Sequence, residues 1–304
     1  MFFRRISPRI GLVAITCLFL VAGFLGGPVI RSAAAQRAAS SSAAAATTTG
    51  SVVIPDFWDP RRRVERPPSG TVQALRFITT DDFPPFNFLD GNGHLTGFNV
   101  DLARAICAEL AIPCTIQARA FSELADRVAD KTADAAIAGI AITAEARARL
   151  DFSDVYLRTP GRFVVRTADA GLAPTAAGLR GKTLAVVEHT AHEAYLAAML
   201  PEVARKLYPT ADAAREAVAK GEADAQFGDG LQLSFWLQSQ AAAGCCVFAG
   251  GPYLESRFFG QGYAIAIAKG ETDTKRAINA ALQSLYEKGV YAELYLRYFP
   301  VGFF

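Results

Sequence analysis

The stretch ADAAIAGIAITAEARARLDFS, residues 133–153, is the most informative part of this chain. Its small apolar residues predict a short buried strand, Gly139 predicts a turn, and Thr143 leads into a predicted helix over 144–149. A strand that ends in a glycine turn before a helix leaves backbone N–H groups free beside a helix N-terminus, and such groups attract anions. The stretch therefore predicts an α/β fold with an anion-binding loop at Gly139.

The chain repeats this alternation of strands and helices from Thr71 onward. Predicted strands cover 75–79, 115–117, 135–138, 162–166, 183–187, 223–227 and 263–268. Predicted helices cover 99–110, 121–129, 144–149, 191–199, 212–220, 232–240, 273–288 and 291–299. Alternation of this kind is typical of α/β lobes with mostly parallel sheets, which bind ligands outside the carboxyl ends of their strands.

Composition bounds the function. The 304 residues carry a net charge of +2 and are 51% hydrophobic, which is enough for one or two ordinary cores and indicates no nucleic-acid partner. The sequence shows no serine-centred triad and no glycine-rich phosphate loop, and we expect no cofactor and no metal site.

The N-terminal residues 1–35 predict a signal peptide. Arg4, Arg5 and Arg9 form a basic start, residues 10–30 lack charge, and three alanines from 33 to 35 form a cleavage pattern. An uncleaved membrane anchor is the alternative, since the apolar run is long enough to span a bilayer. Either reading exports the chain, and we expect a periplasmic location.

Residues 36–70 predict a linker followed by a Pro/Arg-rich segment. The first part is almost entirely Ala, Ser and Thr, which is typical of a flexible linker. Phe57, Trp58 and the three arginines from 61 to 63 follow. This segment either packs on its own domain or contacts a partner.

Cysteine placement predicts a disulfide, which an oxidising periplasm allows. Cys107 lies near the end of a predicted helix and Cys114 near the start of the next strand, so a helix-turn-strand return brings them within bridging distance. Cys245 and Cys246 are adjacent and are either free or bonded to each other. No spacing typical of metal ligands accompanies them.

Four sequence blocks occur in an order that resembles one family. They are TDDFPPF (80–86), GFNVDL (97–102), the stretch over 138–153, and GEADA (221–225) with Gly228 and Asp229 after it. A terminal YAELY (291–295) completes the set. Together they resemble family 3 extracellular solute-binding proteins over about residues 71–300.

The resemblance implies a two-lobed type II periplasmic binding fold with a hinge and a cleft between the lobes. It assigns 71–159 plus 260–304 to lobe 1 and 160–259 to lobe 2. It further implies a monomeric receptor that closes on a small solute and delivers it to the membrane permease of an ABC importer.

The resemblance also assigns ligand contacts. An aromatic residue at Phe83 and another at Phe121 would sandwich the ligand, and carboxylates at Asp81 and Asp229 would bind its amino group. The proline pair after Phe83 makes the backbone stiff, which suits a ring that must face a ligand. Asp229 also fits the N-cap of the following helix, and the two roles are compatible.

The acceptor loop departs from the family pattern. Backbone groups at Ala138, Gly139 and Ala141 remain available, but Ala141 and Ala146 stand where the family has a threonine and a carboxylate-binding arginine. Arg147 comes one residue late, which rotates a helical side chain by about 100°. It either faces the cleft after a loop adjustment or lies on the surface.

The second lobe contributes Glu188 and Thr190 from the turn Glu188-His189-Thr190-Ala191. Thr190 fits an N-cap that could also donate to a ligand, and Glu188 adds negative charge. His189 and His192 lack a third metal ligand, so turn histidines are the better interpretation.

The absent carboxylate clamp and the acidic residues favour a cationic solute, either amino-acid-like or an amine. We expect the site to make little use of a ligand carboxylate and to offer cation–π contact from its aromatic rings. One alternative is a periplasmic dehydratase or lyase on the same fold, with Glu188 and His189 as acid–base groups. Another is an accessory protein of a periplasmic dehydrogenase that docks through residues 51–70.

Overall fold

The computed structural model describes residues 53–55, 64–68, 70–299 and 302–304. The predicted signal peptide over 1–35 lies outside the described residues, as does most of the predicted linker and Pro/Arg-rich segment over 36–70, including Phe57, Trp58 and residues 61–63. Within the part of the chain that is described, no helix combines the length and apolarity needed to span a membrane.

The first sheet has five strands in the order β5-β1-β6-β13-β7. They are β1 (Leu75–Thr79), β5 (Cys114–Ala118), β6 (Ala135–Ala136), β7 (Leu150–Phe152) and β13 (Ala266–Ala268). β1 is parallel to β5 and β6, whereas β13 is antiparallel to β6 and β7. A strand from late in the chain therefore completes a sheet that the early strands begin.

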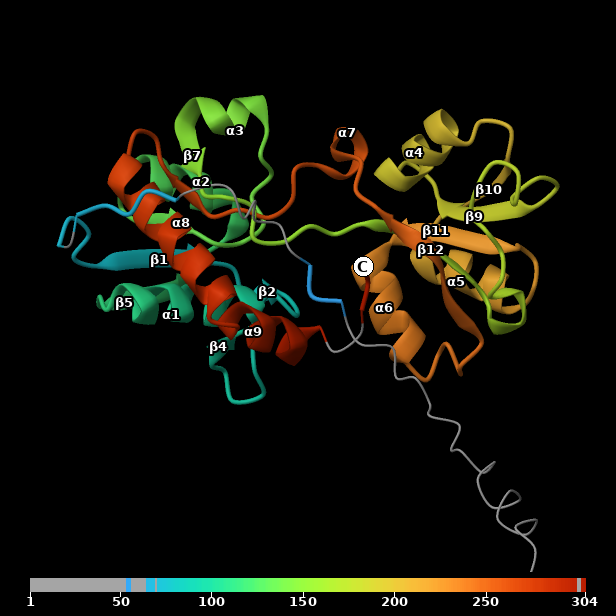
Figure 1. Ribbon diagram of the computed structural model, residues 1–304, viewed down its shortest axis with the longest axis horizontal. Coiled ribbons are helices and arrows are strands. Elements are labelled where there is room, and N and C mark those ends of the chain that lie inside the picture. Colours follow the sequence, from blue (N-terminus) through green and yellow to red (C-terminus); the bar gives the residue numbers. More distant parts are fainter. Residues whose placement is uncertain (1–52, 56–63, 69, 300–301) are drawn as a thin grey trace, which may run out of the picture. The chain divides into compact units, whose positions relative to one another are not determined.

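Helices cover both faces of this sheet. α1 (Phe98–Leu110), α8 (Thr272–Glu287) and α9 (Val290–Tyr298) pack on the face of Phe77, and α2 (Phe121–Ala129) packs on the face of Ile78. Successive residues of a strand point to opposite faces of the sheet, which explains why Phe77 and Ile78 pack against different helices. Figure 1 shows the red α8 and α9 beside the green α1, so the two ends of the described chain share one core.

The second sheet has five strands in the order β10-β9-β11-β8-β12. They are β8 (Gly161–Arg166), β9 (Thr183–Val187), β10 (Ala204–Tyr208), β11 (Ala225–Asp229) and β12 (Cys246–Tyr253). The first three in this order are parallel, and β8 is antiparallel to β11 and β12. α4 (Ala191–Met199) and α7 (Ser256–Phe259) pack on one face, and α5 (Ala211–Ala219) and α6 (Gly230–Gln238) pack on the other.

The remaining elements are short. β2 (Asp82–Phe83), β3 (Asn87–Leu89) and β4 (Leu95–Thr96) form a small antiparallel sheet, α3 (Ala144–Arg149) precedes β7, and a 3-10 turn covers Thr167–Asp169. Thr143 caps α3, since its side chain accepts a hydrogen bond from the Ala146 N–H at 3.1 Å. The predicted strand-turn-helix arrangement around Gly139 is therefore present.

Two chain segments connect the sheets, and they pair with each other. Leu157 and Tyr263 form an antiparallel bridge, in which the Tyr263 N–H donates to the Leu157 carbonyl at 2.7 Å. Gly262 lies beside this bridge with φ +107°, and a Cβ there would sit 2.6 Å from the same carbonyl oxygen. Only glycine fits this position, because other residues combine backbone strain with a steric clash.

The structure corrects some predicted boundaries. The predicted strand over 223–227 is Ala225–Asp229, and the helix predicted over 232–240 is Gly230–Gln238. Asp224 explains the shift, since its carboxylate accepts hydrogen bonds from the Thr183 N–H and Lys182 Nζ and holds the preceding residues as a turn. β10 and β12 were not predicted; both lie at the edges of their sheet and lack a continuous buried pattern.

A disulfide joins Cys107 at the end of α1 to Cys114 at the start of β5, which is the pairing that the sequence predicted. Cys107 is buried against the core, and the chain returns directly from helix to strand.

We expect the double substitution Cys107→Ala/Cys114→Ala to lower the free energy of unfolding by about 2 kcal/mol, because the bond closes a short loop in the unfolded chain. Urea unfolding of the variant and the unaltered protein, both without reductant, measures this. An unchanged midpoint and slope would show that the bond contributes nothing to stability.

Candidate functional site

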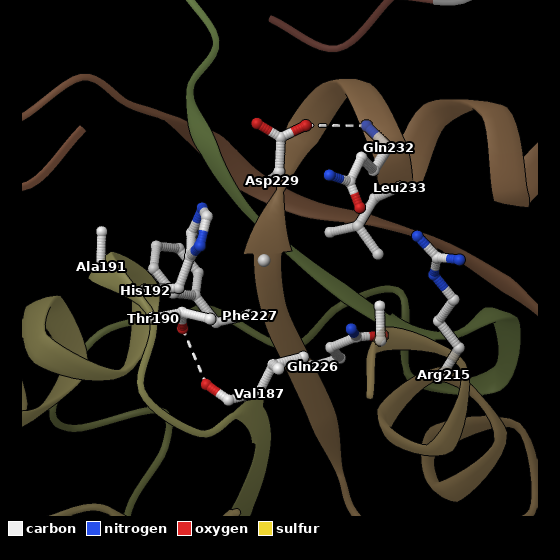
Figure 2. A pocket seen from close by; sticks show the side chains of 12 residues that line it. Val187, Thr190, Ala191, His192, Arg215, Gln226, Phe227, Asp229, Gln232 and Leu233 are labelled. Atoms are coloured by element: carbon white, nitrogen blue, oxygen red, sulfur yellow. Dashed lines mark hydrogen bonds between the residues drawn. The ribbon is translucent and has the colours of Figure 1, made fainter. Parts of the chain in front are cut away.

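A pocket of about 410 Å³ opens at the carboxyl ends of the parallel strands of the second sheet. Its lining residues are Val187, Thr190, Ala191, His192, Ala211, Arg215, Gln226, Phe227, Gly228, Asp229, Gln232 and Leu233. Figure 2 shows Asp229 above the pocket, Arg215 on its right side, and His192 with Phe227 on its left. This is the edge at which α/β sheets bind ligands.

Three helices begin around the pocket. α4, α5 and α6 follow β9, β10 and β11 in turn, so their N-termini meet at one edge of the sheet. Thr190, Thr210 and Asp229 cap these helices with side-chain oxygens. The partial positive charge of each helix N-terminus makes this edge favourable for an anionic group.

Asp229 is the last residue of β11 and the N-cap of α6. One carboxylate oxygen accepts a hydrogen bond from the Gln232 N–H at 2.8 Å (Figure 2). Burial raises the pKa of Asp229 above its ordinary value, while hydrogen bonds from the Gln232 and Leu231 N–H groups and from Thr159 act in the opposite direction. The side chain is thus a partly buried carboxylate with acceptor capacity left, which suits an ammonium group.

Thr190 has less freedom than the sequence indicates. Its hydroxyl donates to the Val187 carbonyl at 2.7 Å and accepts from the Glu193 N–H at 3.2 Å. The Glu193 carboxylate in turn accepts from the N–H of His189, the residue before this N-cap, at 2.6 Å. In this structure the hydroxyl proton is bound to the Val187 carbonyl, and Thr190 forms part of the pocket wall.

His192 closes one side of the pocket. Its ring stacks on Phe259 with centroids 5.1 Å apart and meets Phe227 edge-on at 5.6 Å. Burial lowers the pKa of His192 to about 4, so the imidazole is neutral at pH 7.

Arg215 and Gln226 are pocket residues that sequence reasoning missed. Arg215 projects from α5 and Gln226 from β11, and neither belongs to a motif. The one signal that could have found Arg215 is a cationic residue in the first turns of a helix that follows a strand, at the ligand-binding edge of the sheet.

The structure brings other predicted residues together in the first sheet's part of the chain. Phe83, in β2, is 36% exposed and stacks on Phe86 at 4.8 Å. A Cβ on Gly139, which has φ +71°, would lie 3.6 Å from the Phe83 ring and 2.9 Å from the Tyr263 ring. The glycine loop and this aromatic residue are therefore neighbours, as a shared ligand site requires.

The remaining predicted residues near the first sheet lie at exposed or loop positions. Asp81 is exposed two residues after the end of β1, and Phe121 is 57% exposed at the start of α2. Ala138 is buried, and Ala141 is exposed, with its carbonyl accepting from the Thr143 N–H. Two apolar aromatic faces, Phe83 and Phe121, are thus left open to solvent.

Comparison with known proteins identifies the fold and the family. Residues 75–301 match the bacterial extracellular solute-binding proteins, family 3.

The chain belongs to this family.

The two-lobed fold that the sequence predicted is thereby confirmed.

Similar proteins carry informative names. The chain is 29% identical over 227 residues to the putative ABC transporter arginine-binding protein 2 of Escherichia coli, covering 75% of this chain and 91% of that protein. It is 31% identical over 222 residues to the L-arginine-binding protein of Pseudomonas aeruginosa, covering 71% and 84%. A solved structure of an ancestral cyclohexadienyl dehydratase matches with a TM-score of 0.60 at 22% identity, covering 74% of this chain and 92% of that one.

In this family 3 protein, the Arg147 side chain contacts Gln261 and Phe152. Its guanidinium donates to the Gln261 side chain at 2.9 Å and lies 5.8 Å from the centre of the Phe152 ring. Glu188 follows β9, with its N–H bound to the Tyr208 carbonyl, and is not among the residues that line the pocket. Neither side chain joins Asp229 in the pocket.

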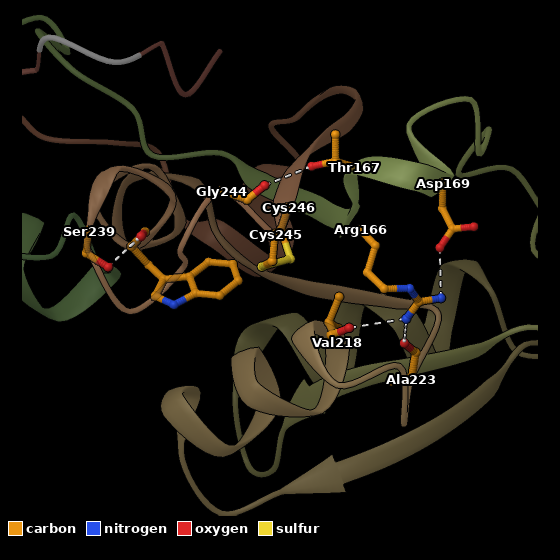
Figure 3. The surroundings of a disulfide bond; sticks show 10 residues. Arg166, Thr167, Asp169, Val218, Ala223, Ser239, Gly244, Cys245 and Cys246 are labelled. Carbon is orange, nitrogen blue, oxygen red and sulfur yellow. Dashed lines mark hydrogen bonds and ion pairs between the residues drawn. A yellow bond between two sulfur atoms is a disulfide. The ribbon is translucent and has the colours of Figure 1, made fainter.

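The second cysteine pair of this solute-binding protein forms a bond between neighbours. Cys245 and Cys246 are joined at the start of β12, and Figure 3 shows them beside Thr167, whose hydroxyl donates to the Gly244 carbonyl at 3.2 Å. They do not line the pocket. Among the described residues, no group of three or more His, Cys, Asp or Glu side chains is arranged to hold a metal ion.

Proposed function

We propose that the chain is the periplasmic receptor of an ABC importer and that it captures an α-amino acid with a cationic side chain between two lobes. Lobe 1 is 71–159 plus 260–304, and lobe 2 is 160–259. This division is supported by the strands, since those of the first sheet fall in the first set of residues and those of the second sheet in the second. The paired segments at Leu157 and Tyr263 would be the hinge.

The observation that carries the proposal is the Asp229 carboxylate, partly buried and held at the rim of a pocket of about 410 Å³ by the N-terminus of α6. Such a group binds an ammonium strongly, because the interaction is charge-assisted and shielded from water. Helix N-termini around the same pocket favour the carboxylate of the same ligand.

Residues of lobe 1 support a ligand with a cationic side chain. Phe83 and Phe121 present exposed ring faces, which attract cations, and Asp81 is an exposed carboxylate. The names of the two arginine-binding relatives agree with this choice. We infer that the receptor acts as a monomer and passes its ligand to an inner-membrane permease.

A dehydratase remains the second candidate, because an ancestral enzyme of that kind shares the fold. Catalysis would need an acid–base group in contact with the substrate. The two candidates from the sequence, Glu188 and His189, are not lining residues of the pocket, and the His189 N–H is bound to Glu193. This arrangement favours a binding protein without catalytic activity. The accessory-protein reading depends on residues 51–70, which lie mostly outside the described part.

Titration calorimetry of the purified protein tests the proposal. The panel contains L-arginine, L-lysine, L-histidine, L-glutamine, L-glutamate and putrescine. We expect at least one cationic amino acid to bind about tenfold or more tightly than L-glutamine, L-glutamate and putrescine, a difference of about 1.4 kcal/mol. The protein should not convert prephenate to product when the two are incubated together. Tight binding of L-glutamate alone, or turnover of prephenate, would contradict the proposal.

A further inference from the structure

We propose that Arg215 forms the subsite for the ligand's α-carboxylate and that Gln226 joins Asp229 in binding its ammonium, so that the second lobe alone recognises the zwitterionic head group. The inference rests on the proposed function, because it assumes an α-amino acid as ligand. It departs from the expectation that the protein makes little use of a carboxylate.

Arg215 and Gln226 carry unused hydrogen-bonding atoms in the same pocket. Gln226 is only 2% exposed, and its Oε1 has no partner among the described residues. The Nε–H of Arg215 is likewise buried without a partner in the described part of the chain. Buried polar atoms are usually paired, because an unpaired one loses its hydrogen bonds to water without compensation. A ligand that brings both an acceptor and a donor would satisfy both atoms.

The charge of Arg215 also favours an anionic ligand group. Among the described residues Arg215 forms an ion pair from Nη1 to Asp212 at 2.9 Å, and the Asp212 side chain is 90% exposed while that of Arg215 is 15% exposed. The Arg215 charge also acts on Asp229, where it opposes the rise in pKa that burial causes. A solvent-exposed partner is screened and neutralises little of the charge that a partly buried guanidinium presents to the pocket. His192 is neutral, and the N-termini of α4, α5 and α6 add positive potential. An anionic group is therefore favoured on the Arg215 side.

The pocket has an acidic side at Asp229 and a basic side at Arg215. In the view of Figure 2, Asp229 lies at the top of the pocket, Arg215 on its right side, and Gln226, which belongs to β11, below Asp229. An α-amino acid presents an ammonium and a carboxylate joined by one carbon. The ammonium would bind Asp229 and Gln226 Oε1, and the carboxylate would accept from Arg215.

The position at which the resemblance implies a carboxylate-binding arginine is not an arginine in this chain. Ala146 stands there, and the Arg147 guanidinium is bound to Gln261. An arginine from α5 would supply the missing contact.

The experiment compares L-arginine with agmatine, which keeps the guanidinium and the amine but lacks the carboxylate. Calorimetry measures both dissociation constants for the unaltered protein and for Arg215→Met, which keeps much of the side-chain length and loses the charge. We expect Arg215→Met to weaken L-arginine binding by about 10- to 100-fold, the loss of a hydrogen-bonded charged contact. Agmatine binding should change by less than about threefold, so the preference for L-arginine over agmatine should collapse.

Three variants separate this role from a structural one. Asp212→Asn removes the partner of Arg215 without touching the pocket, and we expect it to leave both dissociation constants nearly unchanged. Gln226→Met should weaken the binding of L-arginine and agmatine to the same extent, because both carry an ammonium group that donates a hydrogen bond to Oε1. Arg215→Lys keeps the charge and should retain part of the preference for L-arginine, and its thermal unfolding shows whether α5 is intact.

The outcomes are distinguishable. Equal losses for L-arginine and agmatine in Arg215→Met, or none for L-arginine, would overturn the subsite while leaving the receptor function intact. If no amino acid of the panel binds the unaltered protein, the proposed function fails and the subsite fails with it.

Discussion

Replacing Asp229 with asparagine should weaken binding of the amino acid by about 100-fold and leave the unliganded protein at least as stable as before. The carboxylate lies at the pocket and accepts from the Gln232 N–H, so it both caps α6 and faces the ligand. Asparagine caps a helix about as well as aspartate, but it offers an ammonium no charge. Losing one member of a desolvated charge pair costs about 3 kcal/mol, which is about 100-fold in the dissociation constant.

The stability of the unliganded Asp229→Asn protein should not fall together with its affinity. Burial raises the pKa of Asp229, which means that its charged form is disfavoured in the folded protein, so a neutral amide removes a penalty. Asp229→Ala is the matched comparison, because it also removes the cap and should lower the free energy of unfolding by about 1 kcal/mol. Calorimetry and urea unfolding together check this. Unimpaired binding by Asp229→Asn would show that the residue is only a cap.

Acidification should destabilise the protein through His192, by about 2 kcal/mol between pH 7.5 and pH 5. Burial lowers the pKa of this imidazole to about 4, against about 6.5 for an unfolded histidine. Below pH 6.5 the unfolded chain therefore binds a proton that the folded protein does not, and stability falls as the pH falls. The full loss, about 3 kcal/mol, is reached near the folded pKa.

The substitution His192→Phe isolates this effect. A phenyl ring keeps the stacking on Phe259 and the edge contact with Phe227 but cannot take up a proton. Urea unfolding of both proteins at pH 7.5 and pH 5 gives four free energies, and the loss on acidification should be about 2 kcal/mol smaller in the variant. Equal losses in both proteins would place the acid sensitivity elsewhere.

Local sequence signals predicted most of the fold because they reflect local physics. The 3.6-residue spacing of Val100, Ala103 and Ile106 marks the buried face of α1, and all three are fully buried. Thr143 and Thr190 cap the helices that they were predicted to begin. The pairing of Cys107 with Cys114 follows from a helix that returns at once as a strand.

Edge strands and boundaries were harder to predict. β10 lies at the sheet edge and none of its residues is buried, so its sequence does not alternate between apolar and polar. β11 begins late because the Asp224 side chain bonds to Thr183, a residue 41 positions away. Contacts of that kind are not visible in a local pattern.

The sequence by itself determined the α/β class, the family and the order of elements, because hydrophobic period, turns and caps act between residues a few positions apart. The tertiary structure decided which side chains meet. Asp229, Arg215 and Gln226 share a pocket only because β9, β10 and β11 align in parallel and bring three helix N-termini to one edge. Burial then sets their chemistry, since desolvation raises the pKa of Asp229, lowers that of His192, and leaves Gln226 Oε1 without a partner among the described residues.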